Sequence, residues 1–203
     1  MPLNRILGDI PEGKVLVEYE PTKHPERVFH TMMTFYLDSG DVPLVVDVID
    51  TFHVFAQHLA FQGMDLPFGE IPVIKCGGRA DLGNIIGRIN VTDNFEYYLA
   101  QYARIARRFT NPAEKGRQVT FFLGTGKFIV TFQDDPYKLE NYFETIFRGY
   151  GTGGRRIGIF FVNRNIVNDY ALKSLRQDSN YVILVGDGRK LIKSPGRVED
   201  EAL

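Results

Sequence analysis

A glycine-lysine segment follows one of the most apolar stretches of this 203-residue chain. Gly124-Thr125-Gly126-Lys127 comes directly after Val119–Leu123 (VTFFL). Glycines and a lysine are what a phosphate-binding loop uses to wrap backbone N–H groups and a charge around phosphates. The pattern is incomplete, because Phe128 stands where Ser or Thr would hold magnesium and Phe121 stands where the first glycine would be. Since Phe128–Phe132 is also β-rich, we predict a plain turn or hairpin at this segment.

Two acids, Asp47 and Asp50, stand at the end of the apolar run Val42–Val48. A carboxylate just before a helix commonly accepts the backbone N–H groups of the first turn. The simplest interpretation of Asp50 is therefore a cap for a helix that begins at Thr51-Phe52.

The histidines and the cysteine show no spacing typical of a metal or nucleophile site. His53 and His58 are five residues apart and would point about 140° away from each other on a helix, whereas a zinc pair sits at i and i+4. We interpret these two, and His24 and His30, as surface or boundary residues. Cys76 fits a small buried residue, and no Ser, Cys or Thr stands in a nucleophile elbow. We predict no metal and no covalent catalysis.

Arginines are the remaining chemical signal. Gly77-Gly78-Arg79 and Gly87-Arg88 could shape a loop that presents two guanidinium groups to an anion, although turn chemistry explains the glycines equally well. A net charge of -1, from 24 basic and 25 acidic residues, argues against binding nucleic acid by bulk charge. For the basic clusters a solvated face is the simpler interpretation.

The composition, with 44% hydrophobic and 24% charged residues, is that of a globular protein with a sizeable core. It excludes disordered and fibrous classes. A single cysteine rules out an internal disulfide and suits a reducing compartment. No apolar run reaches about 18 residues, and the amino terminus lacks a signal-peptide core. We expect a cytoplasmic protein without a membrane partner.

Continuous apolar runs alternate along the chain with segments whose apolar residues recur every three or four positions, as in amphipathic helices. This alternation predicts a three-layer α/β domain, with a mainly parallel sheet and helices on both of its faces. Ligands of such sheets bind beyond the carboxyl ends of the strands. We expect one domain over residues 1–193 and a polar tail over 194–203. Gly77–Asn90 stays open between strand and turn. The expected strands are Lys14–Tyr19, Val42–Val48, Ile71–Lys75, Val119–Leu123, Phe128–Phe132, Ile157–Val162 and Tyr181–Val185. The expected helices are Pro25–Ser39, Phe52 to near Gly63, Asp93–Phe109 with Asp93 and Glu96 as a capping box, and Asp135–Phe147.

The amino-terminal segment ILGDIPEGKVLVEYEP resembles the start of RecA-like ATPases of the KaiC branch. There a G-x-x-P-x-G turn leads into a strand, a phosphate-binding loop and a helix. Gly8, Pro11 and Gly13 match the turn, and Glu20-Pro21 sits where that branch often has Glu-Pro. GIFFVNRNIVNDYALKSLRQDSNYVILVGDGRKLIKSPGR looks like the branch's late strand, connecting segment and final β elements. As a whole the chain resembles an uncharacterised archaeal family that is similar to a divergent offshoot of these ATPases, and this implies a RecA-like fold.

The loop itself departs from that resemblance. With Pro21 aligned, Pro25 stands at the lysine position, Glu26 at the hydroxyl position, and no glycine is present. The two prolines remove two N–H donors and push the residue before each toward extended geometry. We expect a rigid strand-to-helix loop closed to a triphosphate, with binding weakened by several powers of ten. The degenerate phosphate loop comprises Glu20, Pro21, Thr22, Lys23, His24, Pro25, Glu26 and Arg27.

Most other functional residues that the resemblance implies are also missing from this chain. The resemblance implies a magnesium-holding Asp at the end of VTFFL, where this chain has Leu123-Gly124. Asp50 is the one acid that the resemblance would carry over as a catalytic carboxylate. Arg164 lies in a segment whose counterpart in RecA-like proteins contacts DNA.

The leading expectation is a non-catalytic domain that needs no cofactor and acts as a binding or regulatory module. Its partners would be further copies of itself, through the surfaces that RecA-like proteins use to form rings, or an unidentified protein. Two alternatives stay open. One is an ATPase with a rebuilt loop that uses Lys23 or Arg27, Asp50 and Lys127. The other is a DNA or RNA accessory protein that uses arginines such as Arg79, Arg88 and Arg164.

Overall fold

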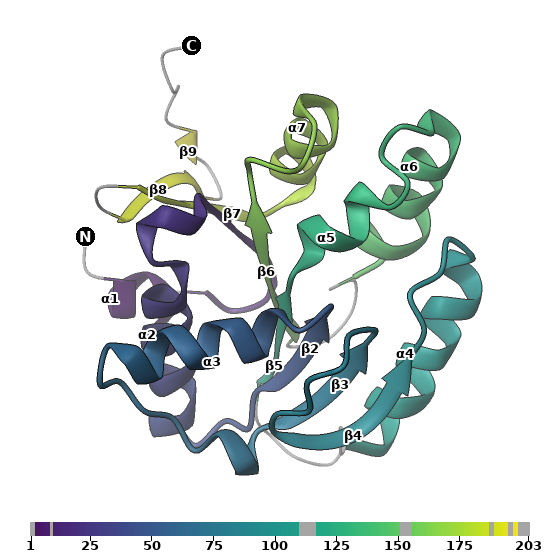
Figure 1. Cartoon of the computed structure of the whole chain (residues 1–203). Coiled ribbons are helices and arrows are strands. Elements are labelled where there is room, and N and C mark those ends of the chain that lie inside the picture. Colours follow the sequence, from purple (N-terminus) through teal and green to yellow (C-terminus); the bar gives the residue numbers. More distant parts are fainter. Residues whose placement is uncertain are drawn as a thin grey trace.

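The computed structural model describes residues 3–8, 10–109, 117–150, 156–186, 189–194 and 197–198. Over these residues the chain forms a nine-stranded sheet in the order β4-β3-β2-β5-β6-β1-β7-β8-β9 (Figure 1). The strands are β1 Gly13–Tyr19, β2 Leu44–Val48, β3 Pro72–Cys76, β4 Asn84–Ile89, β5 Gln118–Leu123, β6 Arg156–Asn163, β7 Tyr181–Val185, β8 Arg189–Ser194 and β9 Arg197–Val198. The helices are α1 Leu3–Gly8, α2 Pro25–Asp38, α3 Thr51–Phe61, α4 Phe95–Phe109, α5 Thr125–Val130, α6 Pro136–Tyr142 and α7 Asp169–Asp178, with 3-10 turns η1 Pro21–Lys23 and η2 Phe68–Glu70 and the π-helix η3 Phe143–Phe147.

In the order of the sheet, the seven strands from β4 to β7 (β4, β3, β2, β5, β6, β1 and β7) are parallel to one another. β8 pairs antiparallel with β7, and β9 pairs antiparallel with β8. This confirms the predicted mainly parallel sheet. β1 lies inside it, with Leu16 opposite Phe160 of β6 and Val182 of β7. A strand buried on both faces reads as a continuous apolar run, and this is why VLV and FFV mark these positions in the sequence.

Each face of the sheet carries its own core. Alternate residues of one strand point to opposite faces, so Val15 and Val17 belong to the core under α1, α2 and α3, whereas Leu16 belongs to the core under α4 to α7. The first core is centred on Phe29, whose ring makes edge contacts with Phe52 and Phe121. Helices therefore cover both faces, as expected.

The segment Phe128–Phe132 corrects the prediction of a strand. It lies in and just beyond helix α5, which begins after Gly124, and the carbonyl of Gly124 accepts the N–H of Lys127 at 2.9 Å. Phe128, Ile129 and Phe132 are buried against the sheet. A five-residue apolar run does not separate a strand from a short buried helix, and here tertiary packing decided. Gly124–Lys127 is accordingly a strand-to-helix junction and no hairpin.

Several smaller differences concern the ends of elements. Gly77–Asn90 resolves into a turn followed by the edge strand β4. Helix α4 is capped by Asn94, whose side chain accepts the N–H of Tyr97 at 3.0 Å, and not by the predicted Asp93. Helices α1 and α7 were not predicted. Arg197–Val198, inside the stretch expected as a polar tail, pairs with β8. No helix in the described part of the chain is long and apolar enough to span a membrane.

Candidate functional site

The loop between β1 and α2 lies at the carboxyl edge of the sheet, where parallel α/β proteins bind ligands. Glu20 is extended (φ -101°, ψ 139°), as predicted, and the turn η1 follows. The prediction for the residue before Pro25 is wrong: His24 adopts the left-handed conformation, with φ 55° and ψ 56°. Histidine tolerates this region better than most residues. The contact of 3.0 Å between its Nδ1 and Glu26 Oε1 supports the conformation.

Glu26 places a carboxylate at the amino end of α2. Its side chain is 1% exposed. Oε1 accepts a hydrogen bond from Gln62 Nε2 at 2.6 Å in addition to the contact with His24. Oε2 has no hydrogen-bond partner among the described residues, and the Nδ1 of His58 lies 3.8 Å from it. The positive end of the α2 dipole therefore faces an anion that belongs to the chain itself.

The surroundings of Glu26 keep this carboxylate ionised. Burial alone would raise its pKa, but hydrogen bonds from its own backbone N–H, from Gln62 and from His24 outweigh burial. The pKa of Glu26 is therefore held below its usual value. Donors that converge on the charged form of a carboxyl group stabilise it.

A second carboxylate cluster lies where β2 and β3 end. Lys75, on β3, is 2% exposed, and its Nζ donates to Asp47 Oδ2 at 2.6 Å and to the carbonyl of Ala80 at 2.6 Å. Its third partner is Asp50. All three protons of the ammonium are used, as a buried lysine requires. Burial acts to lower the pKa of Lys75, but hydrogen bonds to Asp47 and Asp50 raise it overall.

The loop between β3 and β4 closes around Asp50. The backbone N–H groups of Arg79 and Ala80 donate to its carboxylate at 2.8–3.0 Å. Gly78 has φ +78°, and a Cβ there would lie 2.3 Å from Asp50 Oδ1, so the loop needs glycine at this position. Despite the burial that opposes ionisation, the bonds from Lys75, Arg79 and Ala80 lower the pKa of Asp50 to about 2.

This arrangement corrects the interpretation of Asp50 as a helix cap. Asp50 stands before α3 in the left-handed region and makes no side-chain capping bond. The helix is capped by Asp47, because its Oδ1 accepts a hydrogen bond from the N–H of Phe52 at 2.8 Å. The sequence left the loop after β3 open between a guanidinium site for an anion and a plain turn; in the structure it holds the carboxylate of Asp50 through backbone N–H groups.

Lys127 lies at the carboxyl end of β5, next to this cluster. Its Nζ donates to the carbonyl of Ile49 at 2.8 Å. Burial lowers its pKa, and the nearby Asp47 and Asp50 oppose that effect in part. Gly124, before it, packs so closely that a Cβ would lie 2.6 Å from the carbonyl of Val48. The junction is therefore filled by the end of β2.

The three candidate arginines do not form one cluster. Arg88 is paired with Asp81 at 2.6 Å, and Arg79 contributes its backbone N–H. Arg164 follows β6 and donates its backbone N–H to Tyr19. β4 and β6 are four strand positions apart, about 19 Å at the usual spacing. In the described ranges no group of three or more His, Cys, Asp and Glu could hold a metal ion. Cys76 is buried, which raises its pKa to about 12.

Two members of these clusters were missed from the sequence. Gln62, at the carboxyl end of α3, holds Glu26 from 36 positions away, and such a contact leaves no local signal. Lys75 leaves one, because it is a charged residue at the end of the apolar run IPVIK, inside the strand β3. A charge in a strand buried on both faces calls for a buried partner.

Comparison with known proteins identifies a family to which the chain is similar. The family model described as "Pyrococcus protein of unknown function, DUF257" matches residues 7–182. A search of the curated proteins finds no match. A solved Pyrococcus horikoshii OT3 protein, PH0250, is 25% identical, with a TM-score of 0.78 over 96% of this chain and 93% of that one. PH0321 of P. horikoshii, described as uncharacterised and in complex with an unknown peptide, is 16% identical, with a TM-score of 0.64 over 95% and 89%.

More distant structures agree on the fold. An ATPase from the type III secretion system of pathogenic bacteria is 10% identical, with a TM-score of 0.53 over 89% of this chain and 54% of that one. Together with the parallel sheet, this likeness shows a RecA-like α/β fold.

Proposed function

The chain belongs to this Pyrococcus family of unknown function, and from that premise we propose that it is a non-catalytic RecA-like domain that acts by binding. One observation carries the proposal. The buried carboxylate of Glu26 lies at the amino end of α2, the helix that follows β1. In nucleotide-binding α/β folds the amino end of that helix receives a phosphate.

A phosphate at this place would meet both a fixed negative charge and a shortage of donors. Pro21 and Pro25 supply no N–H, and the loop contains no glycine. His24 and Gln62, which could face a ligand, are turned toward Glu26. Bringing a triphosphate against this ionised carboxylate would require breaking those bonds or protonating Glu26.

The rebuilt-loop ATPase has less support. Of its candidate groups, Arg27 donates to Gln62, Asp50 is held by Lys75, and Lys127 is bound to Ile49. β1 and β2 are three strand positions apart, about 14 Å between their axes, so Asp50 would have to act across β5 and β6 on a substrate bound at the loop after β1.

Calorimetry with ATP and magnesium, together with phosphate release, tests the proposal. We expect no heat of binding and no release above background for the natural chain. The Glu26→Gln variant, which removes the charge, should also fail to hydrolyse ATP, since the loop still contains two prolines and no glycine to direct N–H groups at a phosphate. Glu70→Gln, at an exposed site, is the matched control. Phosphate release that Asp50→Ala abolishes would defeat the proposal and favour the ATPase.

A further inference from the structure

A cavity of about 260 Å³ lies on the face of the sheet that α4 and η3 cover. It is lined by α4, by α5, by the end of α6, by η3 and the residues after it, and by β5, β6 and the last residue of β2. Such a volume is close to the lower end of the range for small-molecule sites, about 300–1,000 Å³. It lies apart from the loop after β1, because its floor runs from the starts of β5 and β6 along the face opposite α2.

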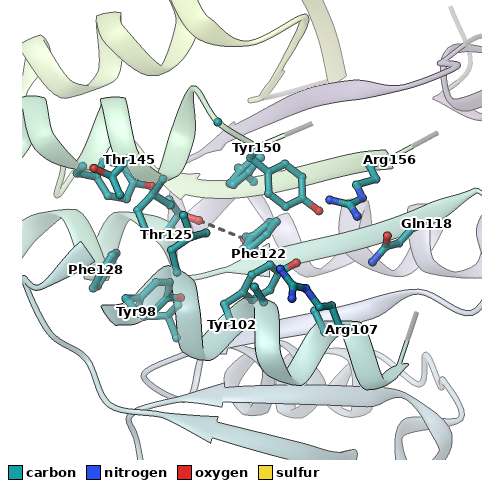
Figure 2. A pocket seen from close by; sticks show the side chains of 18 residues that line it. Tyr98, Tyr102, Arg107, Gln118, Phe122, Thr125, Phe128, Thr145, Tyr150 and Arg156 are labelled. Atoms are coloured by element: carbon teal, nitrogen blue, oxygen red, sulfur yellow. Dashed lines mark hydrogen bonds between the residues drawn. The ribbon is translucent and has the colours of Figure 1, made fainter. Parts of the chain in front are cut away.

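The floor changes character along the strands. Parallel pairing sets Gln118 opposite Arg156, then Thr120 opposite Gly158, then Phe122 opposite Phe160. Residues two apart on a strand are separated by about 6.6 Å, so the polar and aromatic ends of the floor are about 13 Å apart. In Figure 2, Gln118, Arg107 and Arg156 lie toward one side of the cavity, and Tyr98, Phe128 and Thr145 lie toward the other.

The aromatic end is rigid and preformed. Phe122 and Phe160 stack with centroids 4.4 Å apart, and Tyr150 meets Phe122 edge-on at 5.0 Å. Gly158 makes room for Tyr150, since a Cβ there would lie 2.4 Å from its ring. On the α4 side, Tyr98 stacks on Phe128 at 5.1 Å. Faces and edges of this kind suit an aryl group.

The opposite end is positively charged. Arg107, near the carboxyl end of α4, and Arg156, at the start of β6, are the charged members of the lining, and among the described residues the lining contains no carboxylate. Burial raises the pKa values of Tyr102 and Tyr150, and Arg156 acts on both in the opposite sense, so the guanidinium lies within electrostatic range of both hydroxyl groups. Two guanidinium groups and the amide of Gln118 in one lining are donors suited to a carboxylate.

We propose that this cavity binds a small aryl carboxylate, with its ring against the aromatic cluster of Phe122, Phe160 and Tyr150 and its carboxylate at the end lined by Arg107, Arg156 and Gln118. The inference rests on the binding role proposed above, but it uses a different site. A ring and a carboxylate joined by a few methylene groups would span most of the 13 Å floor. The charge at one end distinguishes this ligand from a neutral hydrophobic molecule.

Titration calorimetry with 4-phenylbutyrate tests the inference, with 4-phenylbutan-1-ol and butyrate as matched probes that lack the charge or the ring. We expect saturable binding of the acid and at least about tenfold weaker binding of each partial probe. Arg156→Gln and Arg107→Gln should each weaken binding of the acid about tenfold. Arg104→Gln, also exposed on α4 but bonded to Gln101 and outside the cavity, should leave it unchanged.

Ala103→Phe, which fills the cavity from α4, should abolish binding, and a thermal melt of each variant separates lost binding from lost folding. If Ala103→Phe fails to fold, the two exposed arginine variants still decide. The inference is overturned if the acid does not bind at millimolar concentration, if the alcohol binds equally well, or if Arg104→Gln weakens binding as much as Arg156→Gln. Binding of a peptide with an aromatic carboxyl-terminal residue but not of 4-phenylbutyrate also overturns it. None of these results depends on ATP, so failure here is distinct from failure of the non-catalytic proposal.

Discussion

The ammonium of Lys75 lies 2.6 Å from the carboxylate of Asp47, and both side chains are 2% exposed. Removing one member of a buried ion pair leaves an uncompensated charge, which typically costs about 3–5 kcal/mol. We predict that Lys75→Met lowers the free energy of unfolding by an amount in this range, measured by urea denaturation.

The exposed pair between Arg88 and Asp81 provides the control for that measurement. Arg88→Gln should cost no more than about 1 kcal/mol, since exposed pairs contribute little. A loss in Lys75→Met as small as that in Arg88→Gln would show that the buried pair is not a structural centre of the carboxyl edge.

The lowered pKa of Asp50 predicts how the free energy of unfolding depends on pH at acidic pH. Its pKa is lowered from 3.8 to about 2 in the folded chain, so the unfolded chain binds this proton more readily than the folded one. The stabilisation is present above pH 3.8 and is lost as the pH falls toward about 2. Unfolding measured from pH 5 to pH 2 should show this loss, and Asp50→Asn should reduce the slope over the same interval. If the stability of Asp50→Asn falls with pH as steeply as that of the natural chain, Asp50 is not the group with the lowered pKa.

Glu26 and Asp50 fill comparable positions in two different loops. Each loop directs polar donors toward the carboxyl edge of the sheet, and each receives a carboxylate of the chain itself: Glu26 at the start of α2 and Asp50 between β2 and α3. An internal carboxylate satisfies the donors without loss of a ligand's translational freedom, so a free anion competes poorly with it. This is why we assign binding to the cavity between α4 and the sheet.

The sequence predicted the sheet well, because strands such as β1 and β7 are continuous apolar runs and a parallel sheet buries both faces. It failed at α5, where Phe128–Phe132 has a strand's composition but is packed as a helix under the sheet. The composition of the loop after β1, with two prolines and no glycine, was plain from the sequence. The hydrogen bond from Gln62 to Glu26 in this loop could not be predicted from the sequence, because it joins residues 36 positions apart. The cavity left no signal either, since its lining comes from seven helices and strands, from β2 to β6.

Nucleic-acid binding provides a third prediction. Arg164 is separated across the sheet from Arg79 and Arg88, and the net charge is -1, so any association with DNA or RNA should be weak and electrostatic. Affinity measured by fluorescence anisotropy should fall steeply with salt and vanish near physiological ionic strength, because released counterions drive such binding. Affinity for one sequence that survives at that ionic strength would favour the accessory-protein alternative.

Gly158 links the packing of β6 to the cavity. It has an ordinary backbone conformation, and its restriction is steric: a Cβ would lie 2.4 Å from Tyr150 and 2.8 Å from Phe160. Gly158→Ala must displace the Tyr150 ring, and overpacking of this kind costs about 1–3 kcal/mol. We expect that loss in urea denaturation together with weaker binding of 4-phenylbutyrate, since the ring forms one wall. Gly69→Ala, where a Cβ meets no atom within 4 Å, should change neither. Full affinity in a destabilised Gly158→Ala variant would show that Tyr150 does not shape the site.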